Sequence, residues 1–238
     1  YGMRPSTIEK IKKEHPEAGL IISVDNGIVA FDACEVAAKL GIDVIITDHH
    51  EKEKTIPKSF ALIHTTKTSG SGVAWILARE LGNADDLLAF ATIGTVADQL
   101  PLIGVNRSLV KHGLESLRKS TSIGLLALLR SASIDAKSVG TYEIGYVIAP
   151  RINAMGRMGD AMDALRLLCT PNVARAEILS RQLDKTNIQR QTVVETAVAH
   201  ASQQAGEGNE GMLMLLAHES YHEGVIGLIA GRLTEKFH

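Results

Sequence analysis

The first third of the chain alternates between apolar runs and a helical stretch. Uninterrupted apolar residues occupy 20–24 and 44–47, and a helical spacing of apolar positions lies between them at 31–40. Short continuous apolar runs are typical of strands that are buried on both faces, and a helical crossover makes the two strands parallel. A further run at 60–63 predicts a third strand. The pattern therefore predicts an α/β fold with an open, mostly parallel sheet that is flanked by helices.

From Gly72 onward the spacing of apolar residues becomes helical. A longer helix is predicted from Pro171 to Ala205, because Thr170 offers a capping hydroxyl and proline suits the first helical position. At about 1.5 Å per residue this helix would reach roughly 50 Å, which suits a connection between two domains. The shorter helices are expected near 73–81, 85–97, 106–118, 122–130, 141–149 and 160–168.

A glycine-rich segment at 206–211 separates the long helix from a strand-like run at 212–217 and a helix at 225–236. We therefore expect three regions. The first is an α/β domain over 1–169, the second is a connecting helix over 170–205, and the third is the start of a second α/β domain over 211–238.

Composition and charge narrow the class of protein. Hydrophobic residues make up 45% of the chain and charged residues 22%, which is typical of a folded globular protein. No apolar run approaches the ~20 residues that span a bilayer, so we expect no membrane segment. The 25 basic and 27 acidic residues give a net charge of −2, so a nucleic-acid site would have to be local. Cys34 and Cys169 lack metal-site or disulfide-framework spacing, and we expect a cytoplasmic protein.

Side chains that bind metals follow both of the first two predicted strands. Asp25 comes directly after the first strand, and Asp48, His49 and His50 come directly after the second. Ligands bind at the carboxyl ends of parallel strands, so these side chains are expected to lie in one cluster. Carboxylates suit Mg²⁺ and Mn²⁺, and imidazole shifts the preference toward Mn²⁺. Asp98, at the end of an alanine-rich helix, is a further candidate ligand.

Structural roles compete with this interpretation. Asp25 alone is a common kind of turn former or helix cap. The pair His49 and His50 alone is compatible with a solvated surface. The segment 68–72, rich in glycine and serine, could cradle a phosphate at a helix N-terminus, but close helix packing is the favoured interpretation.

Five segments occur in order along the chain: SVDNG at 23–27, TDHHE at 47–51, GTVADQLPL at 94–102, PRINAMGRM at 150–158 and YHEGVIGLIAGRL at 221–233. The first three resemble successive motifs of the DHH phosphoesterase family, and the last two resemble those of RecJ-type exonucleases. The resemblance covers nearly the whole chain.

The resemblance implies a metal-dependent 5′ to 3′ exonuclease that hydrolyses single-stranded DNA in repair and recombination with two Mn²⁺ or Mg²⁺ ions. It implies that Asp25, His49 and Asp98 are metal ligands. It also implies that His50 faces the scissile phosphate and that Asp48 supports the ligands. Under the resemblance, 1–169 is the catalytic domain and 211–238 begins a nucleic-acid-binding domain.

Five further residues are expected to bind nucleic acid. Guanidinium groups match phosphate oxygens bidentately, and Arg151 and Arg157 lie with Asn153 in what we interpret as a glycine-containing loop. A loop that is tied to nearby carboxylates is the alternative. His222 and Arg232 belong to the last motif and are assigned to nucleic acid through the resemblance.

The family's Asp-x-Asp motif, expected upstream of Tyr1, and the rest of the second domain are missing from the sequence. We therefore expect residues 1–238 to be an internal fragment that does not cleave DNA at the family's rates. Single-stranded DNA is the expected partner, and a single-strand-binding protein is a second partner that the resemblance implies. The alternatives are a DHH phosphodiesterase for short oligonucleotides or cyclic dinucleotides, and a noncatalytic single-strand-binding scaffold.

Overall fold

The computed structural model describes residues 2–206 and 213–237. The chain forms two compact units. The first comprises Tyr1–Ser120 and Ala136–Gly145, and the second comprises Thr121–Asp135 and Tyr146–His238. The proposed division into a catalytic domain, a connecting helix and a second domain stays a prediction beside this division by packing.

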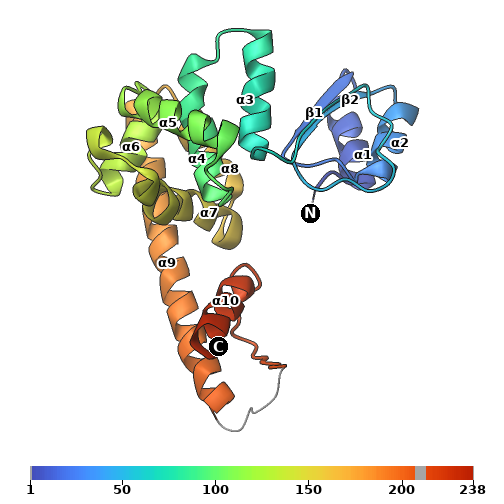
Figure 1. Cartoon of the computed structure of the whole chain (residues 1–238). Helices are drawn as coiled ribbons and strands as arrows, with labels where there is room; N and C mark the ends of the chain where they lie inside the picture. Colours follow the sequence, from blue (N-terminus) through green and yellow to red (C-terminus); the bar gives the residue numbers. More distant parts are fainter. Residues whose placement is uncertain (1, 207–212, 238) are drawn as a thin grey trace. The chain divides into compact units, whose positions relative to one another are not determined.

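The described residues of the first unit form a small sheet, five α-helices and two short 3₁₀ segments (Figure 1). In chain order its elements are α1 (Pro5–Glu14), β1 (Leu20–Val24), α2 (Phe31–Lys39), β2 (Asp43–Asp48), β3 (Ala61–His64), α3 (Gly70–Leu81), η1 (Asp85–Leu87), α4 (Leu88–Ala97), α5 (Gly104–Arg118) and η2 (Ala136–Ser138). Helix α1 was not anticipated from the sequence.

The three strands form one parallel sheet in the order β1-β2-β3, which confirms the predicted topology. Val24 pairs with Thr47, and Asp48 pairs with His64, so the carboxyl ends of all three strands lie at one edge. Gly27 and Gly41 have φ of 117° and 67°, as expected at turns that need a left-handed backbone.

One face of the sheet packs against α1 and α2. The buried apolar cluster between them comprises Ile8, Ala33, Cys34, Ala37, Ile42, Val44 and Ile46. The expectation that the first strand is buried on both faces is wrong for β1, because alternate residues of β1 point away from this cluster. Leu20, Ile22 and Val24 are 50%, 45% and 50% exposed.

The second unit is helical over its described residues. Its α-helices are α6 (Ile123–Ser131), α7 (Ala149–Met158), α8 (Ala161–Cys169), α9 (Val173–Gly206) and α10 (Ile226–Phe237). A π-helical segment, η3 (Glu143–Ile148), runs directly into α7. The predicted loop at 150–158 is therefore wrong. Pro150 lies in the first turn of α7, directly after η3, so no backbone N–H at this position donates into the preceding turn.

The long predicted helix is present as α9, which has 34 residues and is drawn in orange in Figure 1. It begins two residues later than predicted, because Asn172 rather than Thr170 caps it. The Asn172 side-chain oxygen accepts a hydrogen bond from the backbone N–H of Arg175 at 2.9 Å. Thr170 instead accepts from the backbone N–H of Asn172 at 3.2 Å.

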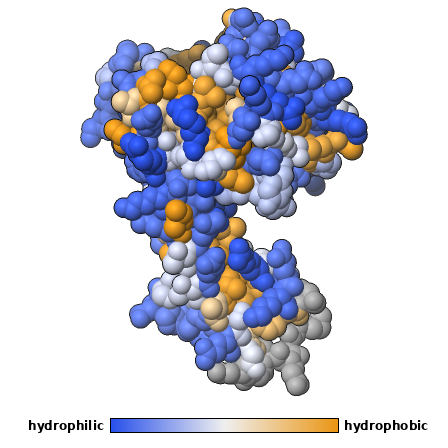
Figure 2. Space-filling model, turned by 90° about the vertical axis from the view of Figure 1, so that its left-hand side faces the viewer, coloured by the Kyte–Doolittle hydropathy of each residue, from blue (hydrophilic) through white to orange (hydrophobic). Residues whose placement is uncertain are grey.

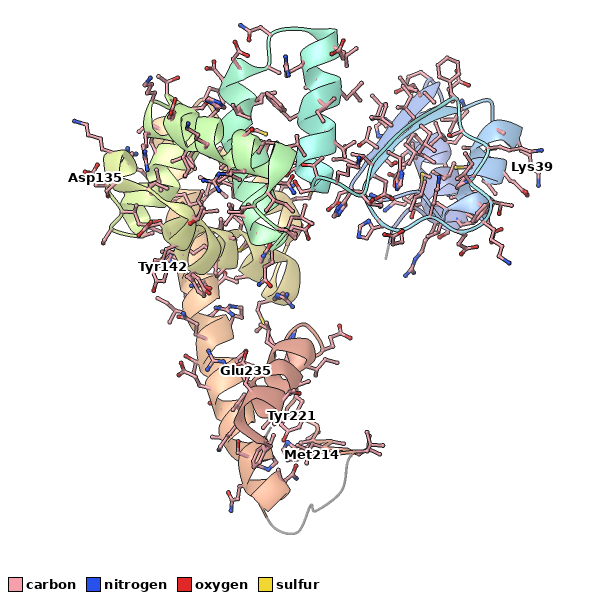
Figure 3. The ribbon with its side chains drawn as sticks, viewed as in Figure 1. Lys39, Asp135, Tyr142, Met214, Tyr221 and Glu235 are labelled. Carbon is pink, nitrogen blue, oxygen red and sulfur yellow. The ribbon has the colours of Figure 1, made fainter. Side chains whose placement is uncertain are left out.

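Helix α10 packs beside the second half of α9 (Figure 1). The buried residues between them are Val194, Ala197, Ala201, Val225, Ile229 and Leu233. Tyr221, labelled in Figure 3, packs against this cluster, and its hydroxyl lies 2.9 Å from Nδ1 of His200.

The predicted strand at 212–217 is wrong over its described residues. Residues 213–217 have no regular structure, and the glycine-rich segment lies mostly outside the described residues. Among the described residues, β1, β2 and β3 pair with one another, and none of them pairs with this segment. Leu213 and Leu215 are exposed. Figure 2 shows hydrophobic residues scattered among hydrophilic ones over the surface.

Across 2–206 and 213–237, no helix combines the length and the apolar character that crossing a membrane requires.

Candidate metal centre

The ends of β1 and β2 bring the first candidate ligands together. Because Val24 pairs with Thr47, the chain leaves both strands at neighbouring positions. The backbone N–H of Asp25 donates to the carbonyl of Thr47 at 2.9 Å, which extends the pairing by one residue. Asp25 has φ of 63°, a left-handed conformation that is uncommon for any residue except glycine. Such backbone strain is often found at functional sites.

His49 lies between two carboxylates. Its Nε2 is 3.1 Å from Oδ1 of Asp25 and 3.5 Å from Oδ2 of Asp98. Asp98 is the C-cap residue of α4, so a helix end supplies the second carboxylate to a site that two strands begin. The His49 side chain is only 12% exposed, whereas the two carboxylates are about half exposed, at 55% and 45%. The cluster therefore has a buried imidazole behind carboxylates that solvent or a ligand can reach.

Asp48 organises the chain around this cluster. Its side chain is 1% exposed, and its Oδ2 accepts a hydrogen bond from the backbone N–H of Ile28 at 2.9 Å. Its Oδ1 accepts from the backbone N–H of His49 at 2.7 Å and lies 2.7 Å from Nδ1 of His50. Burial raises the pKa of the Asp48 carboxyl, but the hydrogen bonds from His50, Ile28 and His49 outweigh burial and hold the pKa below its usual value. Asp48 is therefore an ionised anchor.

The anchor orients His50. Because the ionised Asp48 can only accept, Nδ1 of His50 carries the proton in this pair, and Nε2 points away from it. The hydrogen bond to Asp48 raises the pKa of the His50 imidazole above its usual value. The His50 side chain is 60% exposed, and the His50 carbonyl lies 2.7 Å from Nε2 of His64 at the end of β3.

Gly70, at the start of α3, lies directly against Asp25. A Cβ atom at position 70 would overlap the Asp25 carboxylate, so only glycine leaves room for this approach. The neighbouring Ser69 caps the helix by accepting from the backbone N–H of Gly72 at 3.1 Å. Close packing is therefore what the glycines of 68–72 provide. Burial raises the pKa of the Asp25 carboxyl, although His49 and His50 oppose this.

These residues fit a divalent metal ion. One ligand atom from each of Asp25, His49 and His50 lies within 4.8 Å of the others, and Asp98 lies beside His49. Carboxylate oxygens combined with imidazole nitrogens are a donor set for Mn²⁺, and carboxylates alone also serve Mg²⁺. An ionised carboxylate that holds a ligating or neighbouring histidine by its other nitrogen is the usual support for such a site.

The residues predicted to bind nucleic acid fall in the second unit. Asn153 is exposed on α7, and Arg232 is exposed on α10. Arg157 donates to the carbonyl of Gly224 at 3.1 Å, and Nδ1 of His222 accepts from the Gly224 N–H at 3.0 Å. The end of α7 and the turn before α10 therefore meet within this unit.

Arg151 has a different environment. Its Nε and Nη2 each lie 2.9 Å from Oδ1 of Asp184 on α9, and its Nη1 donates to the carbonyl of Val147. The side chains of Arg151 and Asp184 are only 16% and 28% exposed. This pairing ties α7 to α9, which is the structural alternative that the sequence left open for the segment.

Sequence reasoning missed two residues at these sites. Gly70 was considered within its segment, but its approach to Asp25 depends on how α3 meets the sheet. Arg190 on α9 was not singled out, although Asn187 three residues earlier is a signal, because residues at this spacing lie on one helix face. Arg190 donates from Nε and Nη2 to the side-chain oxygen of Asn187 at 3.2 and 3.0 Å.

Residues 3–96 match the model of the DHH family, N-terminal domain. The match begins before α1 and ends in α4, so it covers the whole sheet and four of the five residues of the candidate centre. The resemblance to the DHH family that the motifs predicted is confirmed for residues 3–96.

Curated relatives match nearly the whole of this chain. The chain is 34% identical to the single-stranded-DNA-specific exonuclease RecJ of Bacillus subtilis over 250 residues, which cover 100% of this chain and 32% of that protein. It is 37% identical to the RecJ of Thermus thermophilus, with 93% of this chain and 34% of that protein covered. The chain therefore spans about a third of the length of these relatives.

Solved structures match the fold. A crystal structure of exonuclease RecJ bound to manganese superposes with a TM-score of 0.85 and 33% identity, over 96% of this chain and 61% of that one. The RecJ of Thermus thermophilus in complex with Mn²⁺ superposes with a TM-score of 0.84 and 33% identity, over 96% and 36%. The chain therefore has the fold of these RecJ structures over nearly all of its length, which confirms the predicted fold class.

Proposed function

We propose that the protein is a metal-dependent exonuclease that hydrolyses single-stranded DNA from the 5′ end, in DNA repair and recombination. The observation that carries the proposal is the cluster of Asp25, His49, His50 and Asp98 around one edge of the sheet. Similarity over nearly the whole of this chain to parts of proteins named as single-stranded-DNA-specific exonucleases supports the same reaction.

Asp25, His49 and Asp98 would hold the metal ions, for which Mn²⁺ and Mg²⁺ are the candidates. Two similar structures support this choice, since they are of RecJ from Thermus thermophilus in complex with Mn²⁺ and with Mg²⁺. Bound divalent ions would activate water and neutralise charge on the phosphate during in-line displacement.

His50 would act beside the metal ligands. Because Asp48 holds its Nδ1, its Nε2 is free to donate to a phosphate oxygen when the ring is protonated. Asp48 would then serve as a positioning residue, since it fixes the ring and the backbone of the segment that carries both histidines.

The second unit would bind the strand. Arg157, Asn153, Arg232 and His222 keep their proposed roles in nucleic-acid binding. Arg151 is the weakest of the proposed contacts, because Asp184 already occupies its guanidinium. We also propose that 1–169 is the catalytic domain, that 170–205 connects it to a nucleic-acid-binding domain beginning at 211, and that a single-strand-binding protein is a partner in the cytoplasm.

The test is a cleavage assay of the full-length protein with 5′- and 3′-labelled single strands, duplex DNA and dinucleotides, each in Mn²⁺, Mg²⁺ or a chelator. We expect products from the 5′ end of single strands alone, and none with the chelator. Asp25→Asn should lower the rate by about 100-fold or more, because it removes a charged ligand from the centre.

Other outcomes would replace the proposal. Cleavage of dinucleotides without cleavage of longer strands would move the protein to the phosphodiesterases of small substrates. Tight binding of single strands without cleavage in either metal would support a noncatalytic binding scaffold. Metal-dependent cleavage that is unaffected by Asp25→Asn would place the reaction at another site.

A further inference from the structure

Three arginines lie on three helices of the second unit that pack together. Arg157 is on α7, Arg190 is on α9 and Arg232 is on α10, and Met158, Val194 and Leu233 of the same three helices share one apolar cluster. Burial lowers the pKa of the Arg190 guanidinium, and the positive charges of Arg157 and Arg232 lower it further. Arginine nonetheless stays charged in proteins. Three cations therefore share one region of the unit.

No carboxylate of the described residues forms an ion pair with any of these three arginines, in contrast to Arg151 and Arg166. Cations that come near one another without a counter-charge repel each other, and partial burial makes this more costly. A negatively charged ligand would relieve both effects.

Arg190 is held in a fixed orientation. Its Nε and Nη2 donate to the side-chain oxygen of Asn187, which is only 2% exposed. This fork leaves Nη1 and the second hydrogen of Nη2 for another acceptor. A guanidinium that is already oriented loses little side-chain entropy when it binds a phosphate.

The other two arginines are also carried by packed elements. A Cβ atom at Gly224 would overlap the backbone of Arg157, and Arg157 donates to the Gly224 carbonyl. The turn before α10 is therefore pressed against the end of α7. Helix α10 in turn packs on α9 through Val194 and Leu233, so packing within the unit holds all three arginines.

We propose that Arg190 contacts a backbone phosphate of single-stranded DNA, together with Arg157 and Arg232, and that Asn187 presents its guanidinium for this contact. The proposal rests on the proposed function and adds to it a residue on the long helix. The ligand is a phosphodiester, because its oxygens accept the paired N–H groups of a guanidinium and its charge is the one that this cluster lacks.

The test measures binding of a fluorescent oligothymidylate in chelator, so that no cleavage intervenes, over a range of salt concentrations. The variant is Arg190→Gln, which removes the charge but keeps a donor for Asn187. We expect about tenfold weaker binding, and a smaller slope of log affinity against log salt by about 0.7, the value for one phosphate contact to a single strand. Arg181→Gln on the same helix is the control, since Arg181 is exposed and outside this cluster.

A thermal melt of each variant shows whether it is folded. Folded Arg190→Gln that binds with the affinity and salt slope of the unchanged protein would overturn the proposal, even where the unchanged protein cleaves single strands. Arg181→Gln with the same loss as Arg190→Gln would also overturn it, because the effect would then be one of net charge. An unchanged protein that neither binds nor cleaves single strands would overturn the proposed function as well.

Discussion

The metal centre and the arginine cluster carry side chains of opposite charge, carboxylates in the first and guanidinium groups in the second. At the metal centre, Asp48 accepts hydrogen bonds from the backbone N–H groups of Ile28 and His49 and lies beside His50, and His49 faces two carboxylates. In the arginine cluster, Arg190 meets further cations and a neutral amide. This contrast supports the two proposals, that the first site holds a cation and that the second receives an anion.

The same contrast separates arginines within the second unit. Arg151 has Asp184 as a partner and connects two helices, whereas Arg190 has, among the residues that the structure describes, the neutral oxygen of Asn187 as its hydrogen-bond partner. A guanidinium with an internal carboxylate stabilises the fold, and one with a neutral partner keeps its charge for a ligand. The predictions below test each side of this contrast.

The largest effect is expected at the buried anchor. Asp48→Asn replaces an acceptor of several N–H groups by a side chain with one oxygen and an NH₂ group that faces donors. We expect the affinity for Mn²⁺, measured by titration calorimetry, to fall about 10- to 100-fold. Asp43→Asn at the opposite, exposed end of β2 is the control and should bind Mn²⁺ unchanged. Equal affinities for the two variants would show that Asp48 does not position the ligands.

A second prediction tests the glycine beside the ligand. Gly70→Ala places a methyl group where the Asp25 carboxylate lies, so Asp25 must move. We expect Mn²⁺ affinity to fall about tenfold while the charge of the site is unchanged. Gly82→Ala, just beyond the end of the same helix, has no atom within 4 Å of the new methyl group and should have no effect. An unaltered affinity in Gly70→Ala would mean that the ligand tolerates the displacement.

A third prediction concerns the internal ion pair. Asp184→Asn leaves the guanidinium of Arg151 partly buried without its counter-charge. We expect the free energy of unfolding to fall by about 1–2 kcal/mol, between the values for exposed and fully buried pairs. Urea denaturation measures this, and Mn²⁺ affinity should stay the same. A stability equal to that of the unchanged protein would refute the structural role of the pair.

The smallest effect is expected at the exposed ion pairs of α8. Arg166 lies 2.7 Å from Asp163 and 3.4 Å from Asp160, but its side chain is 45% exposed. Exposed pairs contribute little because water and salt screen them. Arg166→Gln should therefore leave the midpoint of the same urea denaturation curve nearly unchanged. A loss as large as that of Asp184→Asn would remove the distinction between the two pairs.

The amino-acid sequence determined the elements whose signals are local. The run at 20–24 is β1 as predicted, since a short apolar run bounded by turn residues leaves few alternatives. The start of α9 was misplaced, because two side chains near it can cap a helix and their hydrogen bonds decide between them. The segment 150–158 was predicted to be a loop and is helix α7. The prediction was wrong because Pro150 resembles a helix breaker in sequence, although proline is tolerated in the first turn of a helix.

The clustering of the candidate ligands was also predictable, because Asp25 follows β1 and His49 and His50 follow β2, and neighbouring parallel strands end at the same edge. Only the tertiary structure decided which residues lie beside the other charged side chains. It brought Gly70 against Asp25, Asp184 to Arg151, and Arg157 and Arg232 near Arg190. These contacts join residues far apart in the chain, and their distances depend on how helices pack. Local sequence patterns record a residue's position within its own element, and the packing of elements determines which charge it meets.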